Sequence, residues 1–154
     1  MRRFLRSRSG TSSIEFAIVA PVLCLMLVGM IDTGRYCYFA ILAANAARAG
    51  AQYGAQNLET AYDTPGITTA AVADGEHLPN WTAAGGSVTV NQLCAIDGNP
   101  PQTCATPWGS SPPRNTIYYI QVQVTGTFDP LLSYPGVPGS LPVSGGSTMR
   151  VATQ

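Results

Sequence analysis

The sequence predicts an α+β protein, in which a long N-terminal transmembrane helix extends into a small antiparallel β-sheet head domain. Three observations support this prediction. The residues from Ile14 to Ile31 are apolar except for a single charged residue, Glu15. The chain then stays rich in small, helix-compatible residues as far as Leu58. Every proline except Pro21 lies at residue 65 or later, where alternating apolar residues predict strands.

The N-terminus is basic. Arg2, Arg3, Arg6 and Arg8 precede the apolar stretch with no acidic residue among them. A basic cluster can bind nucleic acid. Because this cluster adjoins a membrane segment, the positive-inside rule is the better explanation, and no nucleic-acid partner is expected. Residues 1–10 are predicted to form a cytoplasmic leader, which places the C-terminal part of the chain across the membrane.

Residues 11–35 are predicted to form the transmembrane helix. The apolar stretch is close to the ~20 residues that a helix needs to cross a bilayer. Tyr36, Tyr38 and Phe39 follow it, where an aromatic belt is expected at the far interface. A cleaved secretory signal is the alternative. It requires a small-residue cleavage site close behind a shorter apolar core, so we favour a retained anchor.

Residues 36–62 are predicted to extend the same helix beyond the membrane, as one continuous helix from Ser13 to about Glu59. At 1.5 Å per residue its length is roughly 65–70 Å, about twice the thickness of the hydrocarbon layer. A single polar stripe follows the extension: Asn45, Arg48, Gln52, Gln56 and Glu59. Small residues allow close packing, either on the protein's own sheet or on other helices: Gly29, Gly34, Ala40, Ala43, Ala44, Ala47 and Ala51.

Residues 63–154 are predicted to form the exported α+β head domain. Thr64-Pro65 begins a short capped helix, because proline favours the first helical position. Strands are expected at 87–90, 117–128 and 148–152, with Pro-, Gly- and Ser-rich loops at 97–113 and 129–146. In the strand at 117–128, alternation places these side chains on one face: Tyr118, Ile120, Val122, Val124 and Phe128.

Cys94 and Cys104 flank a turn-rich segment of the head. Because the head is predicted to be exported to an oxidising compartment, we expect these two residues to form a disulfide. A loop of this size would stabilise the fold by about 2–3 kcal/mol. The alternative is a pair of free thiols. Cys24 and Cys37 are predicted to be small apolar residues of the helix.

The residues that enzymes and metal sites need are scarce. His77 is the only histidine, which excludes a multi-histidine metal site and leaves no histidine partner for a serine nucleophile. An enzyme would need a pocket of convergent carboxylates from Asp74, Glu76, Asp97 or Asp129. We therefore predict a protein that is not an enzyme and needs no cofactor. A different function stays open, an anchored binding module whose proline-rich loops, Trp81 and Trp108 recognise a ligand.

Glu15 has a simple local explanation. Ser12-Ser13-Ile14-Glu15 fits a capping box, in which Ser12 caps the helix and Glu15 accepts from the backbone N–H of Ser12. A carboxylate in the first turn also suits the helix dipole. Capping does not explain why an anchor follows at once, after an arginine-rich leader that ends in glycine.

The segment Gly10-Thr11-Ser12-Ser13-Ile14-Glu15-Phe16 is similar to the prepilin cleavage motif of type IV pilins, a glycine followed by four residues and Glu-Phe. With Pro21, Asp32-Thr33-Gly34-Arg35 and Ala46-Ala47-Arg48, the chain resembles the TadE-like family over about residues 10–54. These are pilin-like proteins of the bacterial tight-adherence (Tad) pilus system. The resemblance implies a pilin-like fold and a minor pilin or pseudopilin that acts in assembly of a Tad (Flp-type) pilus and in adherence.

The resemblance also implies a processing step. A membrane prepilin peptidase is expected to cut between Gly10 and Thr11, which removes the leader and leaves an amino group on Thr11. This cation can pair with Glu15 in the same chain or in a neighbouring subunit and offset the cost of a carboxylate in the membrane. Glu15, Phe16 and Pro21 are the expected assembly and register residues.

The partners that the resemblance implies are the membrane, a prepilin peptidase, other pilin-like subunits and the Tad assembly machinery. The expected location is the bacterial inner membrane. A single span would leave the N-terminus in the cytoplasm and the head in the periplasm or outside the cell.

Overall fold

One long helix dominates the fold. The computed structural model describes residues 9–78, 86–96, 98–104, 115–132, 136 and 138–153, with only the backbone described for residues 9–11. Helix α1 spans Ser9–Gly54, and two short helices follow it, α2 (Leu58–Tyr62) and α3 (Thr64–Asp74). The strands are β1 (Ser87–Ile96), β2 (Gln102–Thr103), β3 (Thr116–Phe128) and β4 (Leu141–Arg150). The predicted α+β class is confirmed.

The four strands form one antiparallel sheet in the order β2-β1-β3-β4. Strand β3 is paired along most of its length on both sides, from Ser87↔Thr125 to Ile96↔Thr116 with β1 and from Tyr119↔Arg150 to Phe128↔Leu141 with β4. Burial alternates along β3. The predicted apolar face of this strand is confirmed, because its five side chains are all buried.

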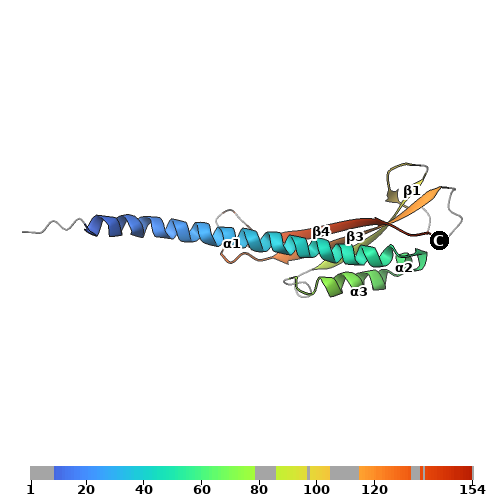
Figure 1. Ribbon diagram of the computed structural model, residues 1–154, viewed down its shortest axis with the longest axis horizontal. Coiled ribbons are helices and arrows are strands. Elements are labelled where there is room, and N and C mark those ends of the chain that lie inside the picture. The colour runs from blue at the N-terminus through green and yellow to red at the C-terminus, as the bar shows by residue number, and fades with distance from the viewer. Residues whose placement is uncertain are drawn as a thin grey trace, which may run out of the picture.

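The C-terminal half of α1 lies along the sheet, and α3 packs beside it, as Figure 1 shows. Ala43, Ala46, Ala47 and Ala51 are completely buried in this contact, together with Ile67 of α3. The predicted polar stripe is exposed on the opposite side. For these alanines the structure therefore selects packing within the protein's own head, whereas Ala44 stays exposed.

The N-terminal half of α1 projects from the head (Figure 1). Its apolar side chains from Ile14 to Ile31 are largely exposed, and this stretch has no buried residue. Within the described residues, this is the one helix that is long and apolar enough to cross a membrane, with a mean hydropathy of 2.5 in its most apolar window. The long apolar helix that the sequence predicts is confirmed.

The long helix ends earlier than predicted. Helix α1 stops at Gly54, so Glu59 belongs to the separate helix α2. Beyond Gly54 the chain leaves the helical path, because the carbonyl of Ala55 accepts a hydrogen bond from the N–H of Ala152 at 2.9 Å and Asn57 is extended. Asn57 then begins α2 through a capping box with Thr60.

Two strand boundaries also differ from the prediction. Strand β1 continues to Ile96 rather than ending at Val90. Strand β4 begins at Leu141, inside the segment 129–146 that was predicted to be a loop, and ends at Arg150. The composition of β4 resembles a loop because it contains Gly145 and Gly146. These residues are nevertheless extended, because they pair with β3.

Helix α3 has the predicted proline in its first turn, and Asp63 is its capping residue. The carboxylate of Asp63 accepts hydrogen bonds from the N–H of Gly66 at 3.0 Å and from the hydroxyl of Tyr53 at 2.8 Å. The bond from Tyr53, followed by that from Gly66, lowers the pKa of Asp63. The same bond to Asp63 is the main reason that the pKa of Tyr53 is raised. This cap therefore ties α3 to the end of α1.

Candidate functional site

The predicted assembly residues lie on the projecting part of α1. Glu15, Phe16 and Pro21 are all exposed there, away from the head. Gly10 and Thr11 lie in the first turns of the same helix. Within the described part of the chain there are two ion pairs, Arg35–Asp32 and His77–Glu76, and Glu15 takes part in neither. The structure therefore places the predicted residues together on one free helical segment, and it leaves their roles in cleavage and assembly as predictions.

The capping-box interpretation of Glu15 is wrong for the uncleaved chain. Helix α1 begins at Ser9, so Ser12 is an interior residue and its backbone is not available for a cap. No acidic residue lies in the first turn. Nothing between Ser9 and Glu15 interrupts a helix, since this segment contains no proline, and Gly10 alone is tolerated near a helix end.

Pro21 lies within α1, and the helix continues on both sides of it. Proline lacks the N–H that would normally donate to the carbonyl of Ala17, four residues earlier. This carbonyl lies on a segment without a covering element, so a neighbouring molecule can approach it.

A second cluster of polar and aromatic residues lies where α1 meets the head. Asp32 directly follows the apolar stretch and is only 6 % exposed. Its two carboxylate oxygens accept from the backbone N–H of Leu131, at 3.2 and 3.1 Å, and one of them pairs with Arg35 at 2.9 Å. Asp32 therefore joins the end of the projecting helix to the loop after β3.

Aromatic rings complete this junction. The Arg35 guanidinium lies 5.1 Å from the centre of the Phe128 ring, in cation–π geometry. Tyr36 meets Phe128 edge-on at 5.7 Å, and Phe39 lies 5.9 Å from it. The Tyr36 hydroxyl donates to the carbonyl of Pro142 at 3.3 Å. Two of the three aromatic residues predicted to form a membrane belt thus contact the head, while Tyr38 is the most exposed of the three.

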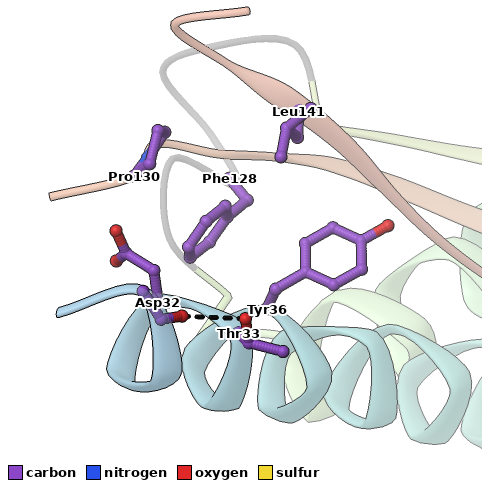
Figure 2. Close-up of a pocket in the computed structure, with 7 residues that line it drawn as sticks. Asp32, Thr33, Tyr36, Phe128, Pro130 and Leu141 are labelled. Atoms are coloured by element: carbon purple, nitrogen blue, oxygen red, sulfur yellow. Dashed lines mark hydrogen bonds between the residues drawn. The ribbon is translucent and has the colours of Figure 1, made fainter. Parts of the chain in front are cut away.

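An open cavity of about 420 Å³ lies at the junction. Its lining comes from α1 and from the neighbouring ends of β3 and β4, and is mostly apolar: Gly29, Asp32, Thr33, Tyr36, Phe128, Pro130 and Leu141. Figure 2 shows the rings of Phe128 and Tyr36 above α1. Pro130 and Leu141 lie further from α1, beyond the two rings. The Thr33 hydroxyl is bonded to the carbonyl of Gly29 at 2.8 Å. Such a lining suits contact with apolar groups rather than acid–base chemistry.

The exposed apolar helix begins near Gly10 and is joined to the head at Asp32. The same segment of the chain matches a known sequence family. Residues 10–52 match the family model for TadE-like proteins. The predicted resemblance is confirmed over this TadE-like segment, which includes Glu15, Pro21, Asp32 and Arg35 and ends two residues before α1 does. No match was found among curated proteins or solved structures.

The role of Asp32 in the TadE-like segment was missed by sequence reasoning. Asp32-Thr33-Gly34-Arg35 contributed to the resemblance without an assigned function. A signal was present, because a charged pair spaced three residues apart directly follows an apolar stretch. Its partner is the backbone of a residue 99 positions away, which no local pattern identifies.

The carboxylates that an enzyme would need are not gathered in the described part of the head. Asp74 and Glu76 lie at the end of α3, where Gly75 approaches Ala46. Asp129 follows β3 near Asp32. Along α1, Asp32 is about 20 Å from Ala46 at the usual rise per residue, so Asp129 lies far from the other two carboxylates. His77 pairs with Glu76 at 3.7 Å, and both side chains are exposed. The described residues contain no group able to hold a metal ion. Asp97 lies outside the described residues.

The remaining predictions concern the four cysteines and the two tryptophans. The structure brings Cys94 of β1 close to Cys104, the residue after β2, with their Cα atoms 5.3 Å apart, a distance typical of disulfides. Oxidation of this pair stays a prediction. Cys24 and Cys37 are exposed free cysteines. Trp81 and Trp108, the aromatic residues of the binding-module alternative, lie outside the described residues.

Proposed function

We propose that this protein is a minor pilin or pseudopilin, processed by a prepilin peptidase, that acts in assembly of a Tad (Flp-type) pilus and in adherence. The match of residues 10–52 supports a pilin-like protein associated with this pilus system and carrying an N-terminal membrane helix. The observation that carries the proposal is the 46-residue helix α1, whose N-terminal half is apolar, exposed and free of the head. A subunit that assembles through such a helix needs this surface to be free.

Processing would create a cation close to Glu15, which takes part in no ion pair among the residues that the structure describes. Cleavage between Gly10 and Thr11 removes four arginines and leaves an amino group four residues before Glu15. Residues four apart lie on one face of a helix, so pairing within one chain is possible, and a neighbouring subunit can supply the same cation. Pairing offsets a cost that reaches about 2.5–3.5 kcal/mol for a charge at the centre of a membrane and is smaller near its edge.

Phe16 and Pro21 support the same role. Phe16 presents a largely exposed ring beside Glu15, and Pro21 leaves a backbone carbonyl without its usual donor. Both features cost little if neighbouring helices cover them in an assembled pilus. We therefore propose that Glu15, Phe16 and Pro21 set the register of the subunit against its neighbours.

We propose a single-pass arrangement in the inner membrane. The leader at 1–10 is cytoplasmic, residues 11–35 form the transmembrane helix, residues 36–62 extend from it, and the head at 63–154 is periplasmic or extracellular. The charged pair Asp32–Arg35 supports an arrangement in which the part of this helix inside the hydrocarbon layer ends close to Ile31 and the last residues lie at the headgroups. The proposed partners are the membrane, a prepilin peptidase, other pilin-like subunits and the Tad assembly machinery.

Mass spectrometry of the native protein tests the processing step. In cells with an active prepilin peptidase, we expect the mature chain to begin at Thr11. In cells without the peptidase, the same protein should begin at Met1. Recovery of Met1 chains alone from the peptidase-positive cells would refute the proposal. An anchored binding module needs no cleavage, so the same measurement separates this alternative.

Substitution of Glu15 tests the assembly step. We expect Glu15→Ala to leave membrane insertion intact and to lower piliation by about tenfold or more, because the carboxylate would no longer pair with the amino group of Thr11 in the same or a neighbouring subunit. Glu59→Ala is the matched control, because Glu59 is an exposed carboxylate of α2, beyond the proposed span. Unchanged piliation of the Glu15 variant would show that this carboxylate has no role in assembly.

A further inference from the structure

The head carries an exposed apolar surface at its membrane-proximal end. In the loop after β3, Leu131 is 58 % exposed and Leu132 is 41 % exposed. On α1, Met30 is 74 % exposed and Ile31 is 46 % exposed. We call these four residues the apolar foot. Single exposed leucines are ordinary on protein surfaces, but these leucines lie beside the end of a long exposed apolar helix.

Asp32 fixes where the two leucines of the foot lie along α1. Its carboxylate holds the backbone N–H of Leu131, so the loop cannot move along α1 without breaking this bond. Leu131 therefore stays level with the first residue after the apolar stretch. In Figure 1 the segment that follows β3 lies beside α1 where the helix leaves the head.

The length of the apolar stretch indicates what covers the foot. Its residues from Ile14 to Ile31 rise about 27 Å along a helix, close to the ~30 Å of a hydrocarbon layer. If this stretch spans the membrane, Asp32 lies at the outer boundary of the layer and Leu131 lies there with it. Arg35 follows one turn later with its side chain 36 % exposed, at the level of the lipid phosphates.

We propose that Leu131 and Leu132 insert into the outer surface of the membrane beside α1 in the subunit before assembly, so that the head rests on the lipid. The partner is the lipid surface itself, and apolar side chains at the acyl boundary are the chemistry that it accepts. The proposal rests on the membrane span of the proposed function. Its consequence is a second point of membrane contact, which holds the head at a defined orientation to the bilayer.

Fluorescence quenching of the full chain in phosphatidylcholine–phosphatidylglycerol vesicles tests this contact. In a background with Cys24→Ser and Cys37→Ser, an environment-sensitive probe is attached at Leu131→Cys, with Leu132→Cys as a second site. The control site is Leu58→Cys, because Leu58 is also exposed but lies on α2, which Figure 1 shows at the end of the molecule remote from the projecting half of α1. We expect lipids brominated near the headgroup to quench the foot probes several-fold more than the control, and iodide in the water to do the reverse.

A probe on Cys24 itself, in a chain that keeps this residue, reports whether the apolar stretch lies in the lipid. Lipid quenching at Cys24 together with full iodide access at both foot sites would overturn the proposal and leave the membrane span intact. Foot probes shielded from both quenchers would also overturn it, because a protein partner such as a second copy would then cover the foot. Iodide access at Cys24 would refute the span, and the foot contact with it.

Discussion

At the scale of single residues, Asp32 is the most informative position outside the predicted processing site. It is a buried carboxylate directly after an apolar helix, and it has two partners from different parts of the chain, Arg35 and the backbone of Leu131. A buried charge is tolerated when it is paired and hydrogen-bonded, as it is here. This residue therefore connects the part of α1 that carries the predicted assembly residues to the folded head.

We expect Asp32→Ala to loosen the membrane-proximal loop. The substitution leaves Leu131 N–H without an acceptor and Arg35 without its carboxylate, at a cost of about 1–3 kcal/mol. Asp32→Asn keeps one acceptor oxygen and should cost less. Hydrogen exchange followed by mass spectrometry should report faster exchange at Leu131 in the alanine variant.

Asp74→Ala is the control for this measurement, because Asp74 is an exposed acidic residue at the end of α3. If Asp32→Ala and Asp74→Ala gave the same exchange at Leu131, the hydrogen bond would not hold the loop.

At the scale of elements, the contact between α1 and β4 determines how the head is packed. Gly145 lies against the backbone of α1 at Ala43 and Ala44, where a Cβ atom would overlap the helix. The next residue, Gly146, has its nearest neighbour, the carbonyl of Val122, at 3.9 Å from a Cβ position. One glycine is thus required for close approach of strand and helix, and its neighbour is not.

This difference predicts opposite outcomes for two adjacent substitutions. Gly145→Ala should force β4 away from α1 and destabilise the head by about 1–3 kcal/mol, a cost typical of overpacking. For a chain of this size, each kcal/mol lowers the melting temperature by about 2–4 °C. Gly146→Ala should leave the melting temperature unchanged or raise it slightly, because alanine restricts the unfolded chain more than glycine does.

Thermal unfolding of both variants in detergent, followed by circular dichroism, measures the difference. Equal melting temperatures for the two variants would contradict the assigned contact between Gly145 and the helix.

At the scale of the whole molecule, one helix serves two environments. Its apolar N-terminal half is exposed and suits lipid or neighbouring helices, while its alanine-rich C-terminal half is buried under a sheet. The exposed half of α1 gives way to the buried half at Asp32, where hydrogen bonds between the helix and the head begin. The two halves can therefore be distinguished in cells by the accessibility of the native cysteines.

We expect a membrane-impermeant maleimide, added to spheroplasts in which pilus assembly is blocked, to label Cys37 and not Cys24. Cys37 is exposed beyond the proposed span, whereas Cys24 lies within it. Cys94 and Cys104 should react only after reduction, because we expect them to be oxidised in an exported head. Cys37→Ser should abolish labelling without reductant, and labelling of Cys24 from the outside would contradict the proposed span.

Much of the helix and part of the sheet could be predicted because their signals are local. The apolar stretch lies within α1, and the buried face of β3 repeats within one strand, so local patterns identify both. The polar stripe was predicted in the same way, although only Asn45, Arg48 and Gln52 of its residues belong to α1. The segment from Gly10 to Phe16 is equally local, and it led to the TadE-like resemblance that residues 10–52 confirm. Roles for Gly10, Thr11, Glu15, Phe16 and Pro21 stay predictions, because they depend on a peptidase and neighbouring subunits.

Features that depend on distant partners were not predictable in this way. After Gly54 the chain bonds to the distant backbone of Ala152, and β4 is a strand because β3 pairs with its glycines and α1 packs against Gly145. Composition alone therefore indicated a longer helix and a loop. The junction at Asp32 is the clearest case, since Leu131 lies 99 residues away in sequence. The amino-acid order by itself predicts a long apolar helix, a TadE-like N-terminal segment and a β-rich head, because each of these signals depends on neighbouring residues. Tertiary packing decides how the head is joined to that anchor, because the hydrogen bonds and ring contacts that join them form only after the chain has folded.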